Sequence, residues 1–221
     1  MFSATLNVAV GTPPTPDRMM RRPVAGGSPQ MVLQEPGGTP ALLDKRFYVW
    51  DYKCPPRPGS PCVLGERNGN DLDLFSLDPV KGKGKQLAKA ADVNFQACCM
   101  HWDLSHDGSQ LTLIGRLRHY GRIEVLTLSD STWQEITPER PFGYPMVIAW
   151  AADGKGFFVT SWDGDSIDLL HVTLGGKVQL LIRNAYRQGQ EEGNLLPSPD
   201  GKYLAYQAQT TDSNVWILEG F

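Results

Sequence analysis

The fold is decided by a seven-residue motif built on Asp-Gly, three copies of which recur along the chain, each between two apolar runs. The copies read Ser105-His106-Asp107-Gly108-Ser109-Gln110-Leu111, Ala151-Ala152-Asp153-Gly154-Lys155-Gly156-Phe157 and Ser198-Pro199-Asp200-Gly201-Lys202-Tyr203-Leu204. Glycine tolerates a positive φ, and aspartate can hydrogen-bond its own turn backbone, so Asp-Gly between two strand-like runs predicts a tight turn. Each copy is therefore interpreted as the turn of a β-hairpin.

The copies recur with a nearly constant period. From Asp107 to Asp153 is 46 positions and from Asp153 to Asp200 is 47, a spacing that fits one four-stranded propeller blade and is too long for most helical repeats. Third strands are expected at residues 72–77, 123–128, 167–172 and 214–218, and fourth strands at 86–88, 134–136 and 178–182. The sequence thus predicts an all-β fold, a β-propeller of four-stranded antiparallel blades with about four to five blades, as a partial propeller or a small ring.

The blades can be assigned within a single domain that spans residues 1–221. Residues 39–91, 92–138 and 139–185 are expected to form full blades, and residues 1–38 and 186–221 partial ones. An N-terminal strand that completes the last blade would close a ring. In the first full blade, the proline-rich loop between Cys54 and Cys62 replaces the Asp-Gly turn. These two cysteines either form a small disulfide or remain reduced, and the sequence leaves both alternatives open.

The composition excludes several classes of partner. Of the 221 residues, 41% are hydrophobic and 20% are charged, which is typical of a globular domain. Lys plus Arg is 21 and Asp plus Glu is 24, a net charge of -3 that argues against nucleic acid or an anionic membrane as partner. There is no run of 18 apolar residues and no readable signal peptide, so direct membrane insertion is not expected.

At these motifs the chain resembles the bacterial TolB-like and WD40-like β-propeller repeat family, whose blades carry the turn written here as Ser198-Pro199-Asp200-Gly201-Lys202. Residues 78–84, 149–156 and 213–219 look most like the C-terminal propeller of bacterial eukaryotic-like serine/threonine kinases and related regulators. The resemblance implies an extracytoplasmic, periplasmic sensor or interaction domain that is joined through a membrane segment to a kinase or DNA-binding domain. Kinase motifs are absent from this sequence, so signalling activity does not carry over, and the likeness is to the C-terminal half of a larger propeller.

No catalytic, cofactor or metal pattern stands out. The sequence lacks a G-x-S-x-G elbow, and no ligand spacing joins the four histidines, which are His101, His106, His119 and His171. The run Cys98-Cys99-Met100-His101 lacks the C-x-x-C-H pattern of haem attachment. The oxygen-rich stretch Asp163-Gly164-Asp165-Ser166, with Asp168, lacks a twelve-residue calcium loop and favours a polar hairpin turn instead. A non-enzyme without cofactor or metal is therefore expected.

Binding residues are expected on one face of the propeller, where the turns from second to third strand and the links between blades come together. Aromatic and arginine side chains on loops held by a rigid scaffold are the types that anchor ligands. The candidate ligand-binding residues are Arg67, Arg118, His119, Tyr120, Tyr144, Trp162, Asp163, Tyr186 and Arg187.

The leading interpretation is a non-catalytic binding or sensor module for a protein, peptide or glycan, and a homodimer that completes one ring is a further expectation. Two alternatives stay open. One is a hydrolase or lyase with its active site in the central channel. The other is a truncated propeller fragment without independent function, because an unclosed sheet exposes strand edges.

Overall fold

The computed structural model describes residues 2–5, 18–34, 50–55, 59–93, 101–114, 121–185 and 195–207, and all its regular elements are β-strands. Two small antiparallel sheets lie at the ends of this part of the chain. The N-terminal sheet contains β1 (Phe2–Thr5), β2 (Arg18–Arg21) and β3 (Gln30–Gln34). The C-terminal sheet pairs β16 (Leu195–Pro197) with β17 (Leu204–Tyr206). Within these residues there is no helix with the length and apolar character needed to cross a membrane.

Three four-stranded antiparallel sheets lie between these two. The first sheet contains β4 (Trp50–Lys53), β5 (Cys62–Asn68), β6 (Asp71–Asp78) and β7 (Gly82–Ala90). The second contains β8 (His101–Leu104), β9 (Gln110–Ile114), β10 (Ile123–Thr127) and β11 (Thr132–Ile136). The third contains β12 (Tyr144–Trp150), β13 (Gly156–Asp163), β14 (Ser166–Thr173) and β15 (Val178–Ala185). In each sheet the strands lie side by side in chain order.

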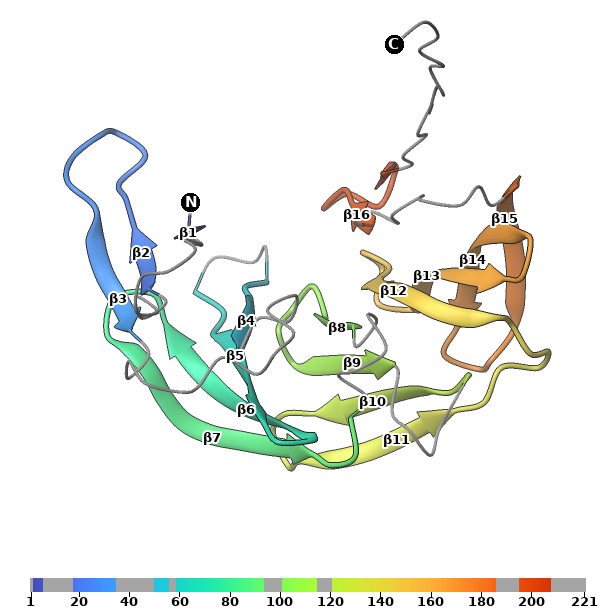
Figure 1. The fold of residues 1–221 in the computed structure, drawn as a ribbon, viewed down its shortest axis with the longest axis horizontal. Helices are drawn as coiled ribbons and strands as arrows, with labels where there is room; N and C mark the ends of the chain where they lie inside the picture. Colours follow the sequence, from blue (N-terminus) through green and yellow to red (C-terminus); the bar gives the residue numbers. More distant parts are fainter. Residues whose placement is uncertain are drawn as a thin grey trace, which may run out of the picture.

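The sheets follow one another round an arc (Figure 1). The first strands β4, β8 and β12 lie on its inner side, and the fourth strands β7 and β11 lie on its outer side. Strand β12 contacts β8 of the sheet before it and β16 of the sheet after it. Four-stranded meanders arranged in this way are propeller blades, so the predicted all-β propeller class is confirmed as an open arc of blades. The strand expected at 214–218 lies outside the described residues.

The repeated aspartates form the turns between first and second strands. Asp107 Oδ1 accepts hydrogen bonds from the Ser109 backbone N at 3.0 Å, from Ser109 Oγ at 2.7 Å and from Ser105 Oγ at 2.8 Å. These bonds, that of the Ser109 backbone foremost, lower the pKa of Asp107 to about 2. The stabilisation is present above the ordinary pKa and is lost as the pH falls through about 2. Asp200 repeats the pattern with the Ser198 hydroxyl and the Lys202 backbone N.

Apolar clusters hold neighbouring sheets together. Between the first and second sheets, Leu74 and Leu113 are fully buried, and Trp102 is 3% exposed. Between the second and third sheets, Phe157 is fully buried and its ring centroid lies 4.6 Å from that of Trp150, which is 4% exposed. Both tryptophans are therefore core residues.

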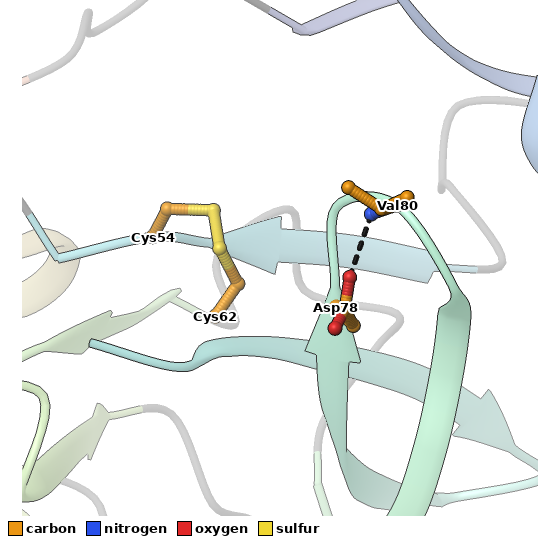
Figure 2. Close-up of a disulfide and its surroundings, with 4 residues drawn as sticks. All are labelled: Cys54, Cys62, Asp78 and Val80. Atoms are coloured by element: carbon orange, nitrogen blue, oxygen red, sulfur yellow. Dashed lines mark hydrogen bonds between the residues drawn. A yellow bond between two sulfur atoms is a disulfide. The ribbon is translucent and has the colours of Figure 1, made fainter. Parts of the chain in front are cut away.

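Cys54 and Cys62 form a disulfide across the loop from β4 to β5, with their Cα atoms 4.2 Å apart (Figure 2). This settles the alternative that the sequence left open. The loop also contacts the second sheet, because Ser60 Oγ donates to the carbonyl of Asp107 at 3.3 Å. Figure 2 also shows Asp78 accepting a hydrogen bond from the backbone N of Val80, at 2.7 Å, in the turn between β6 and β7.

Candidate functional site

One edge of the third sheet brings together three of the predicted binding residues. Tyr144 begins β12, Trp162 and Asp163 end β13, and the strand register places Tyr144 directly opposite Trp162. The register shifts between Pro145 and Val147, so a bulge separates this pair from the rest of the strand pair. Side chains directly opposite one another on antiparallel strands lie within contact distance. We call Tyr144, Trp162, Asp163 and the following turn, Gly164 and Asp165, the aromatic edge.

The turn orients the tryptophan. Trp162 Nε1 donates a hydrogen bond to the carbonyl of Gly164 at 2.8 Å, and the backbone N of Asp165 donates to the carbonyl of Asp163 at 2.8 Å. Gly164 has a φ of +68°, which favours glycine at this place. The Trp162 side chain is 41% exposed. A large aromatic side chain is thus held in one orientation at the surface.

Gly143 lies in the link between the second and third sheets, where the backbone passes very close to that of Trp162. A Cβ atom at Gly143 would lie 2.0 Å from the carbonyl oxygen of Trp162 and 2.9 Å from the Cα of Asp163. No real Cβ contact is this short, so any larger residue would displace the backbone. The absence of a side chain at Gly143 therefore lets Tyr144 begin its strand beside Trp162.

An ion pair between a buried carboxylate and an exposed guanidinium adjoins the aromatic edge. Arg183 Nε donates to Asp168 Oδ1 at 2.8 Å, and its Nη2 donates to Oδ2 at 2.6 Å. The Asp168 side chain is 9% exposed and that of Arg183 is 57% exposed. The hydrogen bonds from Arg183 lower the pKa of Asp168, and Asp163 and Asp165 add negative charge near Arg183. Bidentate pairing of this kind holds the guanidinium in a fixed orientation.

The sequence carries no signal for this pair: Asp168 stands out only as an oxygen ligand for a cation, and Arg183 does not stand out. The two residues lie 15 positions apart, and only the register of β14 against β15, which pairs them, brings them together. Within the part of the chain that the structure describes, no group of three or more His, Cys, Asp or Glu side chains could hold a metal ion.

Arg67, another predicted binding residue, does not join the aromatic edge. Arg67 lies near the end of β5, in the first sheet. Its Nε donates a hydrogen bond to the carbonyl of Gly69 at 3.1 Å. Arg67 therefore lies at the turn between β5 and β6, which corresponds in the first sheet to the turn between β13 and β14 in the third. Arg118, His119, Tyr120, Tyr186 and Arg187 lie outside the described residues, and their predicted role stays a prediction.

The inner strands carry a second polar group. Asp103 on β8 accepts a hydrogen bond at its Oδ2 from the backbone N of Trp150 on β12, at 2.8 Å, and so links the second and third sheets. Burial raises the pKa of Asp103, against the effect of this hydrogen bond and of the positive charge of Lys53, while the Asp51 carboxylate raises it further. The buried environment of Asp103 thus disfavours the ionised form of its carboxyl group.

We expect Asp103→Asn to keep the link and remove the cost of the charge. Because the folded-state pKa is raised, protonation favours the folded state, and this stability is lost as the pH rises through the raised pKa. The Asn variant should therefore be at least as stable as the wild type at pH 7, with the difference shrinking as the pH falls toward the ordinary pKa. Urea unfolding at several pH values measures this.

Asp103→Ala is the control for that experiment, because it removes the acceptor and leaves the Trp150 backbone N–H unpaired. A loss of about 1–3 kcal/mol in the free energy of unfolding is expected at all pH values. Equal destabilisation by Asn and Ala at pH 7 would show that the carboxylate charge stabilises the link, contrary to this account.

Comparison with known proteins supports the fold. No family model matches the sequence, and neither does any curated protein. The chain is similar in structure to TolB from Acinetobacter baumannii, with a TM-score of 0.58 and 18% identity, over 90% of this chain and 44% of that one. It is also similar to a protein assigned as TolB from Agrobacterium tumefaciens, with a TM-score of 0.59 and 16% identity, over 87% of this chain and 63% of that one.

A further similarity is to a protein assigned as a 6-phosphogluconolactonase from Bacteroides uniformis, with a TM-score of 0.51 and 11% identity, over 88% of this chain and 57% of that one. Identities this low show the fold alone. The chain spans less than two thirds of the length of each of these three proteins. The protein therefore has a β-propeller fold similar to that of these TolB structures, and its activity must be argued from its own residues.

Proposed function

We propose that this chain is a non-catalytic propeller module that binds a protein, peptide or glycan partner through the aromatic edge of the third sheet. The observation that carries the proposal is the pairing of Tyr144 with Trp162 at a sheet edge where Trp162 is 41% exposed. Aromatic side chains held rigidly at a surface lose little conformational entropy when a partner covers them, and they are enriched among residues that dominate binding energy. The fixed Arg183 guanidinium nearby offers directional hydrogen bonds at the same edge.

A sensor role outside the cytoplasm is the finer form of the proposal. It rests on the resemblance of residues 78–84, 149–156 and 213–219 to the C-terminal sensor propellers of bacterial eukaryotic-like serine/threonine kinases. The disulfide between Cys54 and Cys62 supports it, because structural disulfides persist in oxidising compartments.

The enzymatic alternative needs a reactive group in the central channel. Two described acidic residues lie on the inner strands. Asp103 accepts a hydrogen bond from the backbone N of Trp150, and Asp51 Oδ2 lies 3.8 Å from Lys53 Nζ. This arrangement supports a structural role for these groups, and we therefore place the binding function first.

The proposal is tested by the double variant Tyr144→Ala/Trp162→Ala. Partners are first captured from extract and from glycan and peptide libraries, and the Kd of each identified partner is then measured for wild type and variant. Loss of a central aromatic anchor costs about 2 kcal/mol or more, so the Kd should rise by about 30-fold.

Tyr203→Ala is the matched control. Tyr203 is also an exposed aromatic residue, at 75% exposure. It follows the Asp-Gly turn between β16 and β17, whereas the aromatic edge lies at the turn between β13 and β14. Its Kd should equal that of the wild type. If every partner bound the double variant as tightly as the wild type, the aromatic edge would not be the binding surface.

A further inference from the structure

The chain contains four Asp-Gly dipeptides, a pair of residues that can rearrange covalently without an enzyme. Three lie in the repeated turns, at Asp107, Asp153 and Asp200, and the fourth is Asp163-Gly164 in the aromatic edge. The rearrangement begins when the backbone N of the glycine attacks the side-chain Cγ of the aspartate. Glycine favours this attack because it has no Cβ to obstruct the approach and adopts backbone conformations closed to other residues.

In the three repeated turns the attacking nitrogen is held by a hydrogen bond. Each glycine N donates at 2.9 Å to the carbonyl of the residue three positions earlier, and these glycines are Gly108, Gly154 and Gly201. A nitrogen whose N–H is bound within a turn must lose that bond before it can approach the carboxyl group. The turn geometry therefore slows the attack at all three places.

The carboxyl groups of the same three turns are held as well. Oδ1 of each aspartate accepts a hydrogen bond from the backbone N two positions later, at 3.0 Å for Asp107 and Asp153 and at 3.2 Å for Asp200. Hydrogen bonds, from the Ser109 backbone foremost, lower the pKa of Asp107 from 3.8 to about 2. The neutral acid is the reactive form because its hydroxyl can leave as water, so a lowered pKa slows the reaction further.

Asp163-Gly164 has neither restraint. Among the described residues, no hydrogen bond binds the backbone N of Gly164 or the carboxyl group of Asp163. A Cβ placed on Gly164 would meet no atom within 4 Å, so the turn has open space around it. Asp163, Gly164 and Asp165 are all exposed, and water can reach the reacting atoms. The structure thus leaves this dipeptide free to react while it protects the other three.

We propose that Asp163-Gly164 is a site of spontaneous isoaspartate formation. Gly164 N forms a bond to Asp163 Cγ, and the carboxyl hydroxyl leaves as water with the proton of the amide nitrogen, which closes a succinimide ring. Water then adds to the carbonyl carbon attached to Asp163 Cα and breaks its bond to Gly164 N. One water is lost and one is gained, so the product is an isomer in which Cγ carries the peptide bond.

The modification regulates the aromatic edge, a consequence that rests on the proposed binding function. The rearranged main chain contains the Cβ of residue 163, and the carbonyl that accepts the hydrogen bond of Asp165 N becomes part of a free carboxylate. The adjoining bond from Trp162 Nε1 to the Gly164 carbonyl, at 2.8 Å, depends on the same turn. Isoaspartate at residue 163 therefore releases Trp162 from its fixed orientation and weakens partner binding.

The first experiment maps isoaspartate in the full chain after several weeks at pH 7 and body temperature. Mass spectrometry with electron-transfer fragmentation distinguishes isoaspartate from aspartate at each of the four positions. Asp163 should contain more than the other three, by about tenfold or more over Asp107, whose lowered pKa reduces its reactive form. The matched control is the same protein in urea, where the turns are lost and the four dipeptides should react at similar rates.

Two outcomes of this mapping would overturn the proposal. One is isoaspartate in the folded protein at Asp107, Asp153 or Asp200 that reaches the level at Asp163. The other is no isoaspartate at Asp163 in the folded protein when the protein in urea forms it there.

The second experiment follows the indole N–H signal of Trp162 by nuclear magnetic resonance, assigned by its loss in Trp162→Phe. The signal should shift in the incubated wild type and stay in place in incubated Asp163→Glu, because the larger ring that glutamate would have to close forms far more slowly. An unchanged signal in protein that carries isoaspartate at residue 163 would overturn the regulatory effect. A shifted signal with an unchanged partner Kd would instead contradict the proposed function and leave the modification site standing.

Discussion

Replacing Phe157 with alanine is expected to lower the free energy of unfolding by about 3–5 kcal/mol. Phe157 is fully buried in the cluster that joins the second and third sheets, where its ring lies against that of Trp150. Its removal leaves a cavity between two sheets whose backbones are held by their own ladders, so the site can collapse only in part. Urea unfolding followed by circular dichroism measures the loss.

Phe158→Ala is the control for this prediction. Phe158 is half-buried on the opposite face of the same strand, and its ring centroid lies 5.3 Å from that of His171. Its replacement should cost less than half as much as that of Phe157. Equal losses for the two variants would mean that the cluster between the sheets is not the dominant packing interface.

The second large effect is expected from the double variant Cys54→Ser/Cys62→Ser. Removing the disulfide frees a short loop in the unfolded chain, and a loss of about 2–4 kcal/mol in the free energy of unfolding is typical of such a change. The wild type in a dithiol reductant should unfold with the same midpoint as the variant, and the reductant should not shift the midpoint of the variant.

The same variant should also loosen the contact between the first and second sheets. The disulfide loop places Ser60 within hydrogen-bond distance of the Asp107 carbonyl, and a Cβ at Gly108 would lie only 3.1 Å from Pro55 Cγ. Hydrogen exchange at the turn around Asp107 should therefore be faster in the variant than in the wild type. Unchanged exchange there, together with unchanged stability, would show that the disulfide constrains nothing beyond its own loop.

The strand pattern could be predicted from the sequence because each hairpin has a local cause. Asp107 and Asp200 hold their turns with hydrogen bonds to residues within two positions, so the signal is contained in a few letters. The fourth strands were harder to bound. Strand β7 extends over Gly82–Ala90, although only 86–88 was expected, because its glycine and lysine residues do not resemble a strand. Their strand conformation comes from pairing with β6.

The candidate site could be predicted only in part for the same physical reason. Trp162 and Tyr144 were singled out by residue type and by their place next to turns. Their placement opposite one another depends on a register that includes a bulge, and on the close approach of Gly143 to the Trp162 backbone. Neither feature has a signal in a single sequence. The pairing of Asp168 with Arg183 likewise requires knowledge of which residues oppose one another across two strands.

The hydrogen bond from the Trp150 backbone to Asp103 has a geometric consequence for the whole arc. It joins the innermost strands of two successive sheets, where a small change in separation becomes a large change at the outer strands. A side chain as short as aspartate reaches the neighbouring backbone at 2.8 Å over a narrow range of tilts. Asp103 thus limits, together with the apolar cluster around Phe157, how far the second and third sheets can tilt relative to one another on the inner side of the arc.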